Sequence, residues 1–157
     1  MKAASIKEIK DELEFCSTSE IRALCLHLAR FKKENKELLT YLLFKSSNEA
    51  GFIDSIKEEM AESFGSINTS SPYYIKKSAR KILKDVKKYI RYSKKKETEI
   101  ELLLHYCALL REVTPDLDRH VALRNLFRRQ IDYVRKTMKS VHEDLQYDFN
   151  KELSKLV

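Results

Sequence analysis

The sequence contains very little glycine and proline, with two of each among 157 residues, far below average usage. Strands joined by hairpins need turn residues about every 8–12 positions, whereas helices joined by short polar segments need few. The scarcity excludes β-rich folds and predicts an all-α protein. It also excludes the glycine-rich phosphate loops of nucleotide-binding enzymes and the G-x-S-x-G elbow of hydrolases, because Gly51 and Gly65 are the only glycines.

Cysteine is also scarce, and its pattern excludes a disulfide framework. Cys16, Cys25 and Cys107 are odd in number, widely separated and not arranged as CxxC, which favours a reducing compartment. The opening MKAASIKEIK lacks the apolar region of a secretory signal. No stretch approaches the roughly 20 apolar residues of a membrane span. We therefore expect a cytoplasmic protein with no membrane contact.

Apolar residues recur at intervals of three and four along most of the chain, the spacing of one helix face. Ser-x-x-Glu capping boxes at Ser5 and Ser17 predict two helix starts, and Ser71 followed by Pro72 predicts another. Asp118 is expected to cap a long helix near the C-terminal end. Five of the predicted helices span about residues 5–15, 17–31, 49–64, 72–95 and 97–113. A further helix is predicted after the polar turn at 32–36, and a long helix is predicted from Asp118 onward. A last apolar segment either continues this long helix or forms a separate one.

These seven or eight short-linked helices predict a single domain over residues 1–157. Short links make neighbouring helices antiparallel, either in a compact bundle or in a short HEAT-like array of hairpins. Cys25 and Cys107 are expected to be small core residues. Apolar faces of the second and third helices are expected to join the core: Ile21, Leu24, Cys25, Leu28 and Phe31, and Leu38, Leu39, Leu42 and Leu43.

Basic residues are concentrated in the helix predicted at 72–95. Between Pro72 and Glu97, eleven Lys or Arg stand against two acids, so this segment carries +9 and the remainder −2 of the total +7. Its apolar residues line one side at helical spacing, and the cations cover the rest. The candidate polyanion-binding residues are Lys76, Lys77, Arg80, Lys81, Lys84, Lys87, Lys88, Arg91, Lys94 and Lys95.

Three interpretations of this charge remain open. The acidic helix at 49–64, net −4, could neutralise it; it could bind nucleic acid through phosphate contacts; or it could bind an acidic protein. Tyr73, Tyr74, Tyr89 and Tyr92 lie on the same helix and are candidates for stacking on bases or for the rim of the core. A weaker basic cluster includes Arg128 and Arg129, which either extend this surface or, through Arg128, pair with Asp132.

Motifs for catalysis and metal binding are incomplete. His142-Glu143 begins like HExxH, but position 146 is glutamine. Glu101 and His105 are four residues apart, whereas carboxylate di-iron bundles use an interval of three. We therefore expect no metal, no cofactor and no catalytic residues, and we do not expect an enzyme.

Three stretches carry a resemblance to known proteins: LARFKKENKELLTYLLF at 28–44, KKSARKILKDVKKYIRYSKKKETEIELL at 76–103 and HEDLQYDFNKEL at 142–153. Together they resemble a small family of uncharacterised all-helical bacterial proteins. The resemblance implies a helical cytoplasmic protein and carries no activity or site residues with it.

The sequence therefore predicts a non-enzymatic binding or scaffold module. Protein–protein interaction through a helical surface is the expected function, with a protein partner. The alternative is sequence-nonspecific nucleic-acid binding through the basic face of the helix at 72–95. The oligomeric state stays open.

Overall fold

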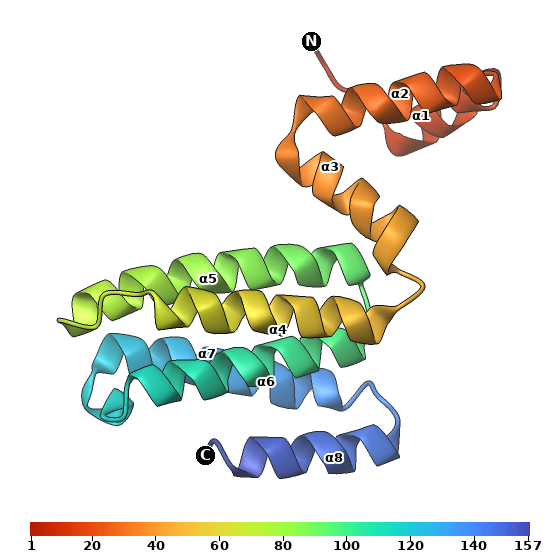
Figure 1. Ribbon diagram of the computed structural model, residues 1–157. Coiled ribbons are helices and arrows are strands. Elements are labelled where there is room, and N and C mark those ends of the chain that lie inside the picture. The colour runs from red at the N-terminus through yellow and green to blue at the C-terminus, as the bar shows by residue number, and fades with distance from the viewer. The chain divides into compact units, whose positions relative to one another are not determined.

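The computed structural model describes residues 1–157 and contains eight α-helices and no strand (Figure 1). The predicted all-α fold is confirmed. A π-helical turn at Tyr41–Lys45 and a 3-10 turn at Leu117–Arg119 are the other helical elements. The α-helices are α1 (Ile6–Leu13), α2 (Thr18–Phe31), α3 (Lys33–Thr40), α4 (Glu49–Gly65), α5 (Pro72–Ser93), α6 (Lys96–Val113), α7 (Val121–Met138) and α8 (Glu143–Ser154).

The predicted capping boxes form at the starts of α1 and α2. Ser5 Oγ accepts from the Glu8 amide at 3.3 Å, and the Glu8 carboxylate accepts from the Ser5 amide at 2.7 Å. Ser17 repeats this arrangement at the start of α2. Ser71 caps α5, with Pro72 at its first position, where the missing N–H costs no hydrogen bond.

The prediction that Asp118 caps the seventh helix is wrong. The residue at the N-cap of α7 is His120, and Asp118 lies in the preceding 3-10 turn, with its carboxylate 3.4 Å from Arg111. Leu117 in this turn is fully buried, and Asp118 beside it pairs with an arginine of α6 instead of capping α7. α8 is separate from α7, which ends at Met138.

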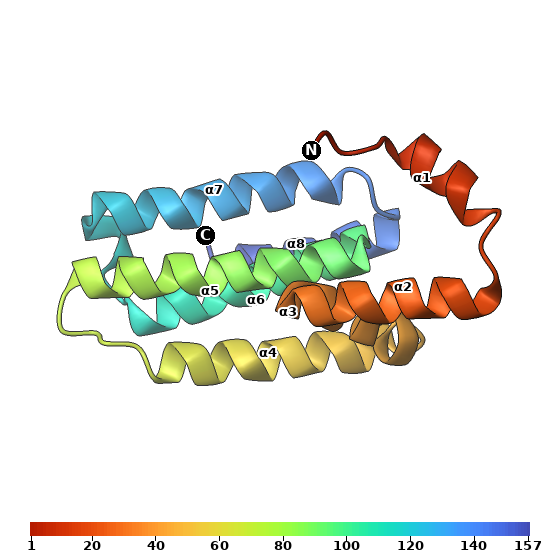
Figure 2. The same cartoon turned by 90° about the horizontal axis from the view of Figure 1, so that it is seen from above.

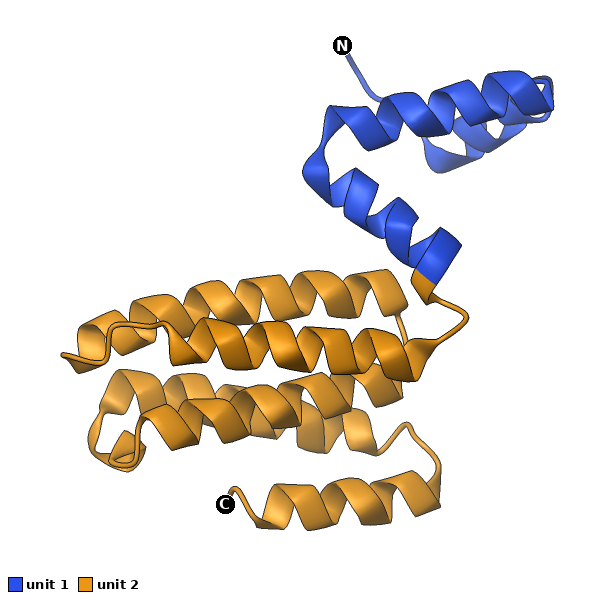
Figure 3. Cartoon of the chain, in the orientation of Figure 1, with its two compact units in different colours: residues 1–44 blue, residues 45–157 orange.

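The chain divides into two compact units, residues 1–44 and residues 45–157 (Figure 3). In the first unit α2 packs against α3, and the Asn35 side chain donates to the Leu28 carbonyl at 2.8 Å across their junction. No side chain of α1, α2 or α3 is buried. The prediction that Cys25 is a core residue is therefore wrong, because its side chain is exposed. A single domain over residues 1–157 stays a prediction.

The second unit is a helical bundle centred on α6, which packs against α4, α5, α7 and α8 (Figures 1 and 2). The centre of α6 is entirely enclosed, because Leu102, Tyr106, Cys107 and Leu110 have no exposed surface. The predicted core position of Cys107 is thus confirmed. Burial raises the pKa of its thiol to about 12, so this cysteine stays protonated and structural.

None of the helices combines the length and the apolar character that a membrane crossing requires.

Candidate functional site

The basic helix α5 has two chemically opposite faces. Ile75, Ala79, Ile82, Leu83, Val86 and Ile90 are buried, at spacings that keep them on one side of the helix. The cations therefore occupy the opposite side. Burial of the apolar side offsets the repulsion between lysines one turn apart, which costs roughly 0.2–0.5 kcal/mol per pair.

Six cations form a continuous stripe on the exposed side of α5. At about 1.5 Å rise per residue, the stripe extends roughly 21 Å along the helix. None of its members pairs with a carboxylate within the 4.0 Å that defines an ion pair. We call these residues the cationic stripe: Lys77, Arg80, Lys81, Lys84, Lys87 and Arg91, all exposed.

The other four candidates lie elsewhere. Lys76 and Lys88 are half-buried, and their ammonium groups lie 5.5 Å and 4.6 Å from the ring centroids of Tyr73 and Tyr89. Lys94 is exposed at the C-cap of α5 in a left-handed conformation, φ 58°. Lys95 belongs to a polar cluster around a carboxylate of α4.

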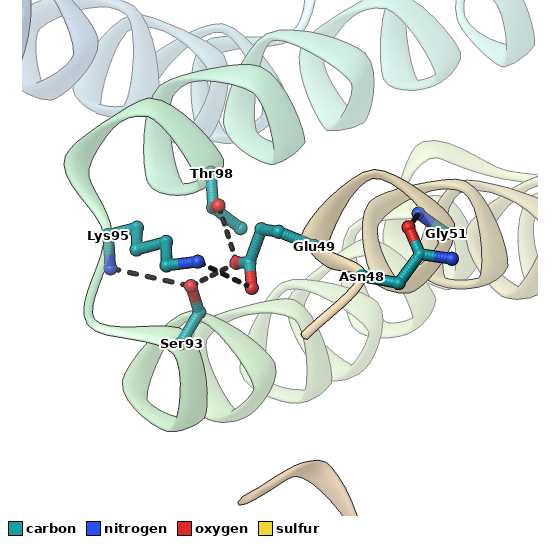
Figure 4. Close-up of polar contacts among 6 residues, drawn as sticks. All are labelled: Asn48, Glu49, Gly51, Ser93, Lys95 and Thr98. Carbon is teal, nitrogen blue, oxygen red and sulfur yellow. Dashed lines mark hydrogen bonds and ion pairs between the residues drawn. The ribbon is translucent and has the colours of Figure 1, made fainter. Parts of the chain in front are cut away.

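That carboxylate is Glu49, at the start of α4 (Figure 4). It accepts hydrogen bonds from the hydroxyls of Ser93 and Thr98, the latter at 2.7 Å, and lies 3.3 Å from the ammonium of Lys95. The preceding Asn48 caps α4 by accepting from the Gly51 amide at 3.0 Å. The cluster joins α4, the end of α5 and the start of α6, so the charge of Lys95 serves the fold.

The acids of α4 leave the cationic stripe unpaired although the two helices pack together. Glu59 accepts from the Tyr89 hydroxyl at 3.0 Å, a neutral donor. Asp54, Glu58 and Glu62 are exposed and form no ion pair with α5. Glu49 of α4 thus engages Lys95 at the C-terminal junction of α5, whereas the acids of α4 form no ion pair with the cationic stripe.

The four tyrosines of α5 divide into two pairs. Tyr73 and Tyr74 are 60% and 46% exposed, and Tyr73 lies one turn before Lys77 on the face of the cationic stripe. Tyr92 is buried, and Tyr89 is half-buried with an edge contact to Phe52. The rings of Tyr73 and Tyr74 contact each other edge to face, with their centroids 5.5 Å apart, and remain accessible to solvent. Tyr89 and Tyr92 belong to the rim of the core.

A second group of ionisable residues lines a groove of about 520 Å³ between α4, α6 and α8. There Lys57 Nζ lies 2.5 Å from the Glu101 carboxylate, and His105 is half-buried beside them. Burial, followed by the charge of Lys57, lowers the pKa of His105 below its ordinary value of 6.5. Lys57 and Glu101 are 44 residues apart, so no local sequence pattern could pair them. The groove holds no hydroxyl or thiol nucleophile.

The weaker basic cluster partly lines another groove, of about 700 Å³, beside α7. Arg128 and Arg129 are exposed there. The interpretation that Asp132 pairs with Arg128 is wrong, because its carboxylate lies 3.6 Å from Arg135 instead. No group of three or more His, Cys, Asp or Glu side chains is placed to hold a metal ion.

No protein-family model matches the sequence, and no curated protein or solved structure matches it. The helical fold that the resemblance implies is confirmed by the structure.

Proposed function

We propose that this protein is a binding module that holds the phosphate backbone of nucleic acid on the cationic stripe of α5. One observation carries the proposal: six exposed cations lie on one helix face without a carboxylate partner. Lysine and arginine contacts to phosphates need no sequence motif, because each releases condensed counterions from the backbone.

An exposed aromatic ring favours nucleic acid over an acidic protein as the occupant of the stripe. Tyr73 lies on the same face as the cations and is 60% exposed. Proteins that bind single strands combine a positive track for the backbone with rings on which bases stack. An acidic protein would use the cations and would have no base to stack on the exposed part of this ring, which otherwise contacts Tyr74 and Lys76.

Fluorescence anisotropy with labelled single-stranded and duplex oligonucleotides tests the proposal. Binding should be independent of sequence and should weaken steeply with salt. If all six cations contact phosphates, log K against log salt has a slope of about −4 on single strands and about −5 on duplex. Absence of binding at low salt would remove the proposal and leave an acidic protein as the partner.

A matched pair of variants assigns the binding surface. Replacing Lys77, Lys81, Lys84 and Arg91 by glutamine removes four stripe cations and should reduce the salt slope by about four phosphate contacts. The control replaces four exposed lysines outside α5 and lowers the net charge equally. Equal loss in both variants would show that net charge, not the stripe, drives binding. The control positions are Lys136, Lys139, Lys151 and Lys155, all exposed.

A second candidate function, protein–protein interaction, is favoured by a different observation. The apolar faces of the N-terminal helices α1 to α3 are exposed to solvent. Exposed apolar surface of this extent is typical of interaction sites. The two functions use different residues and are compatible in one protein.

Cytoplasmic location and membership in the bacterial family named above belong with this proposal. The first rests on the three scattered cysteines and the second on the three stretches that carry the resemblance. We propose no catalytic role.

A further inference from the structure

A groove beside α7 gathers four arginines and no lysine. It has a volume of about 700 Å³ and is lined by residues of α6, of α7 and of the segments that follow α6 and α8. Every lining residue belongs to residues 45–157, so the second unit forms this groove by itself. Four arginines and two aspartates give it a net charge of +2. We call it the arginine groove, and its charged lining residues are Arg111, Asp118, Arg128, Arg129, Asp132 and Arg135.

The arginine groove and the cationic stripe differ in the kind of cation they offer. Four of the six stripe residues are lysines, whereas every cation that lines the groove is an arginine. A guanidinium is planar and presents parallel N–H groups that match two oxygens of one phosphate or carboxylate, whereas an ammonium acts as a point charge. The groove is therefore suited to an oxyanion that is held at more than one oxygen.

Arg111 is held in place before any ligand arrives. Its Cζ atom lies 4.8 Å from the ring centroid of Phe127, which is buried, and this cation–π contact fixes the guanidinium. A fixed group loses little conformational freedom on binding. The side chain of Arg111 is 33% exposed, so a ligand in the groove can reach it. Its Nε atom is buried and has no hydrogen-bond partner in the protein.

The aspartates of the groove engage two of its arginines loosely. Arg111 Nη1 lies 3.4 Å from the Asp118 carboxylate, and Arg135 Nη1 lies 3.6 Å from the Asp132 carboxylate. Both distances exceed the roughly 2.7–2.9 Å of a strong charge-assisted hydrogen bond. A guanidinium has five N–H donors, so each of these arginines retains donors for a further acceptor.

The remaining two arginines carry the net charge of the groove. Arg128 and Arg129 are exposed and have no carboxylate within the 4.0 Å that defines an ion pair. Arg128 directly follows Phe127, the residue whose ring Arg111 covers. Arg111 and Arg128 therefore flank the groove at the same level of α7, one fixed and the other unpaired.

We propose that the arginine groove binds a phosphate monoester, with Arg111 and Arg128 as its main contacts. A phosphate monoester carries about −1.5 to −2 charge at pH 7 and three acceptor oxygens, which balances the +2 of the groove. The backbone phosphate of a nucleic acid carries a single charge and would balance half of it. The volume lies within the roughly 300–1,000 Å³ of small-molecule sites, so the organic part of the ligand fits as well.

This inference is independent of nucleic-acid binding on α5, because the arginine groove and the cationic stripe share no residue. A phosphate monoester occurs in small phosphorylated molecules and at the 5′ end of a nucleic acid strand. Both sources present the same dianionic group to the groove, and the experiment separates them.

Isothermal titration calorimetry of the full-length protein in a phosphate-free buffer tests the inference. The probes are ribose 5-phosphate and inorganic phosphate, with ribose as the control that lacks the anion. We expect one site for ribose 5-phosphate, competition by inorganic phosphate, and no heat of binding with ribose. A short oligonucleotide with a 5′ phosphate is then compared with the same oligonucleotide without it as a competitor. Displacement by the phosphorylated strand alone, at lower concentration than inorganic phosphate, would identify the strand end as the source; otherwise the source is a small molecule.

Two groove variants and one matched control assign the binding to the groove. Arg128→Gln removes an exposed guanidinium, and Arg111→Lys keeps the charge but loses the planar fork. Each should weaken binding of ribose 5-phosphate by about tenfold or more, the worth of one hydrogen bond to a charged group. Arg91→Gln removes an exposed arginine of the cationic stripe and should leave the affinity unchanged. Circular dichroism checks that Arg111→Lys folds, and the exposed position of Arg128 keeps the test valid if it does not.

Three results would overturn the phosphate site. The first is the absence of binding by ribose 5-phosphate at millimolar concentration. The second is an equal loss of affinity in Arg128→Gln and Arg91→Gln, which would mean that net charge alone attracts the anion. The third is unchanged affinity in both groove variants, which would place the phosphate elsewhere on the protein.

Discussion

The hydroxyl of Tyr106 donates a hydrogen bond of 2.9 Å to the main-chain carbonyl of Ala79. Both residues are fully buried, and the bond joins the central helix α6 to α5. The helix that carries the cationic stripe is therefore attached to the core by a polar contact as well as by apolar packing. Burial raises the pKa of Tyr106 well above the usual range of tyrosine, so the hydroxyl remains a donor at any working pH.

We predict that Tyr106→Phe destabilises the protein by about 0.5–1.5 kcal/mol, the usual net contribution of one hydrogen bond. Phenylalanine keeps the ring and its packing against Phe64, so the change isolates the hydroxyl. Urea unfolding followed by circular dichroism measures it. Tyr133→Phe is the control, because that tyrosine bonds Glu99 at 2.8 Å on the surface and should cost less. An equal loss of stability in the Tyr106→Phe and Tyr133→Phe variants would contradict the conclusion that the buried hydrogen bond of Tyr106 stabilises the contact between α5 and α6.

Glu49→Ala should destabilise the protein by about 1–3 kcal/mol, the cost of leaving buried polar partners unsatisfied. The Thr98 side chain is 1% exposed and would lose the carboxylate that accepts from its hydroxyl. The midpoint of denaturant unfolding is the measurement. Glu58→Ala removes an exposed carboxylate of the same helix and should change the midpoint little. A small effect at Glu49 would mean that the cluster in Figure 4 does not hold the helices together.

Stability should fall as the pH drops from 7 toward 5, partly through His105. Burial, and then the nearby Lys57, lower its pKa in the folded protein below 6.5, so the unfolded chain binds the proton more readily. The contribution of His105 to the free energy of unfolding is fully present above about pH 6.5, and it is lost as the pH falls through the lowered pKa of the folded state. NMR titration of the histidines measures the shift directly. His105→Gln should flatten the loss of stability between pH 7 and pH 5, whereas the control His142→Gln, at an exposed position, should leave it unchanged. An ordinary pKa at His105 in the folded protein would contradict this prediction.

The stability of the protein should rise when salt is added at low ionic strength. Salt screens the repulsion between neighbours of the cationic stripe, such as Lys77 and Lys81 or Lys84 and Lys87. The four-residue glutamine variant of the stripe should be at least as stable as the natural protein and should respond less to salt. Melting temperatures over a salt series decide this. Collapse of the variant would mean that these cations stabilise the fold.

Helix starts proved the most predictable part of the fold, since a capping box is a contact within four residues. Ser5 and Ser17 form theirs as expected. The expectation for Asp118 was wrong because Asp118 lies in a 3-10 turn with the buried Leu117, and its carboxylate faces Arg111 instead of the amides at the start of α7. In the candidate site, the amphipathic division of α5 follows from spacing alone. The ion pair between Lys95 and Glu49 could not be predicted from spacing, because 46 residues separate the two.

The apolar faces of α2 and α3 show a different limit of sequence reasoning. Periodicity establishes that a face is apolar, and it says nothing about which surface covers it. Cys107 and Cys25 look alike in the sequence, each beside aliphatic residues on a helix. One is buried and the other is exposed, because α6 is surrounded by four helices and α2 packs against α3 alone among the larger contacts.

The cationic stripe is short in comparison with a nucleic acid. It extends roughly 21 Å along one helix, and the phosphates of one DNA strand follow each other at about 3.4 Å along the duplex axis. The stripe therefore matches about six consecutive phosphates, one for each of its cations. A longer polymer would then offer room for further copies of the protein side by side rather than more contacts for each copy.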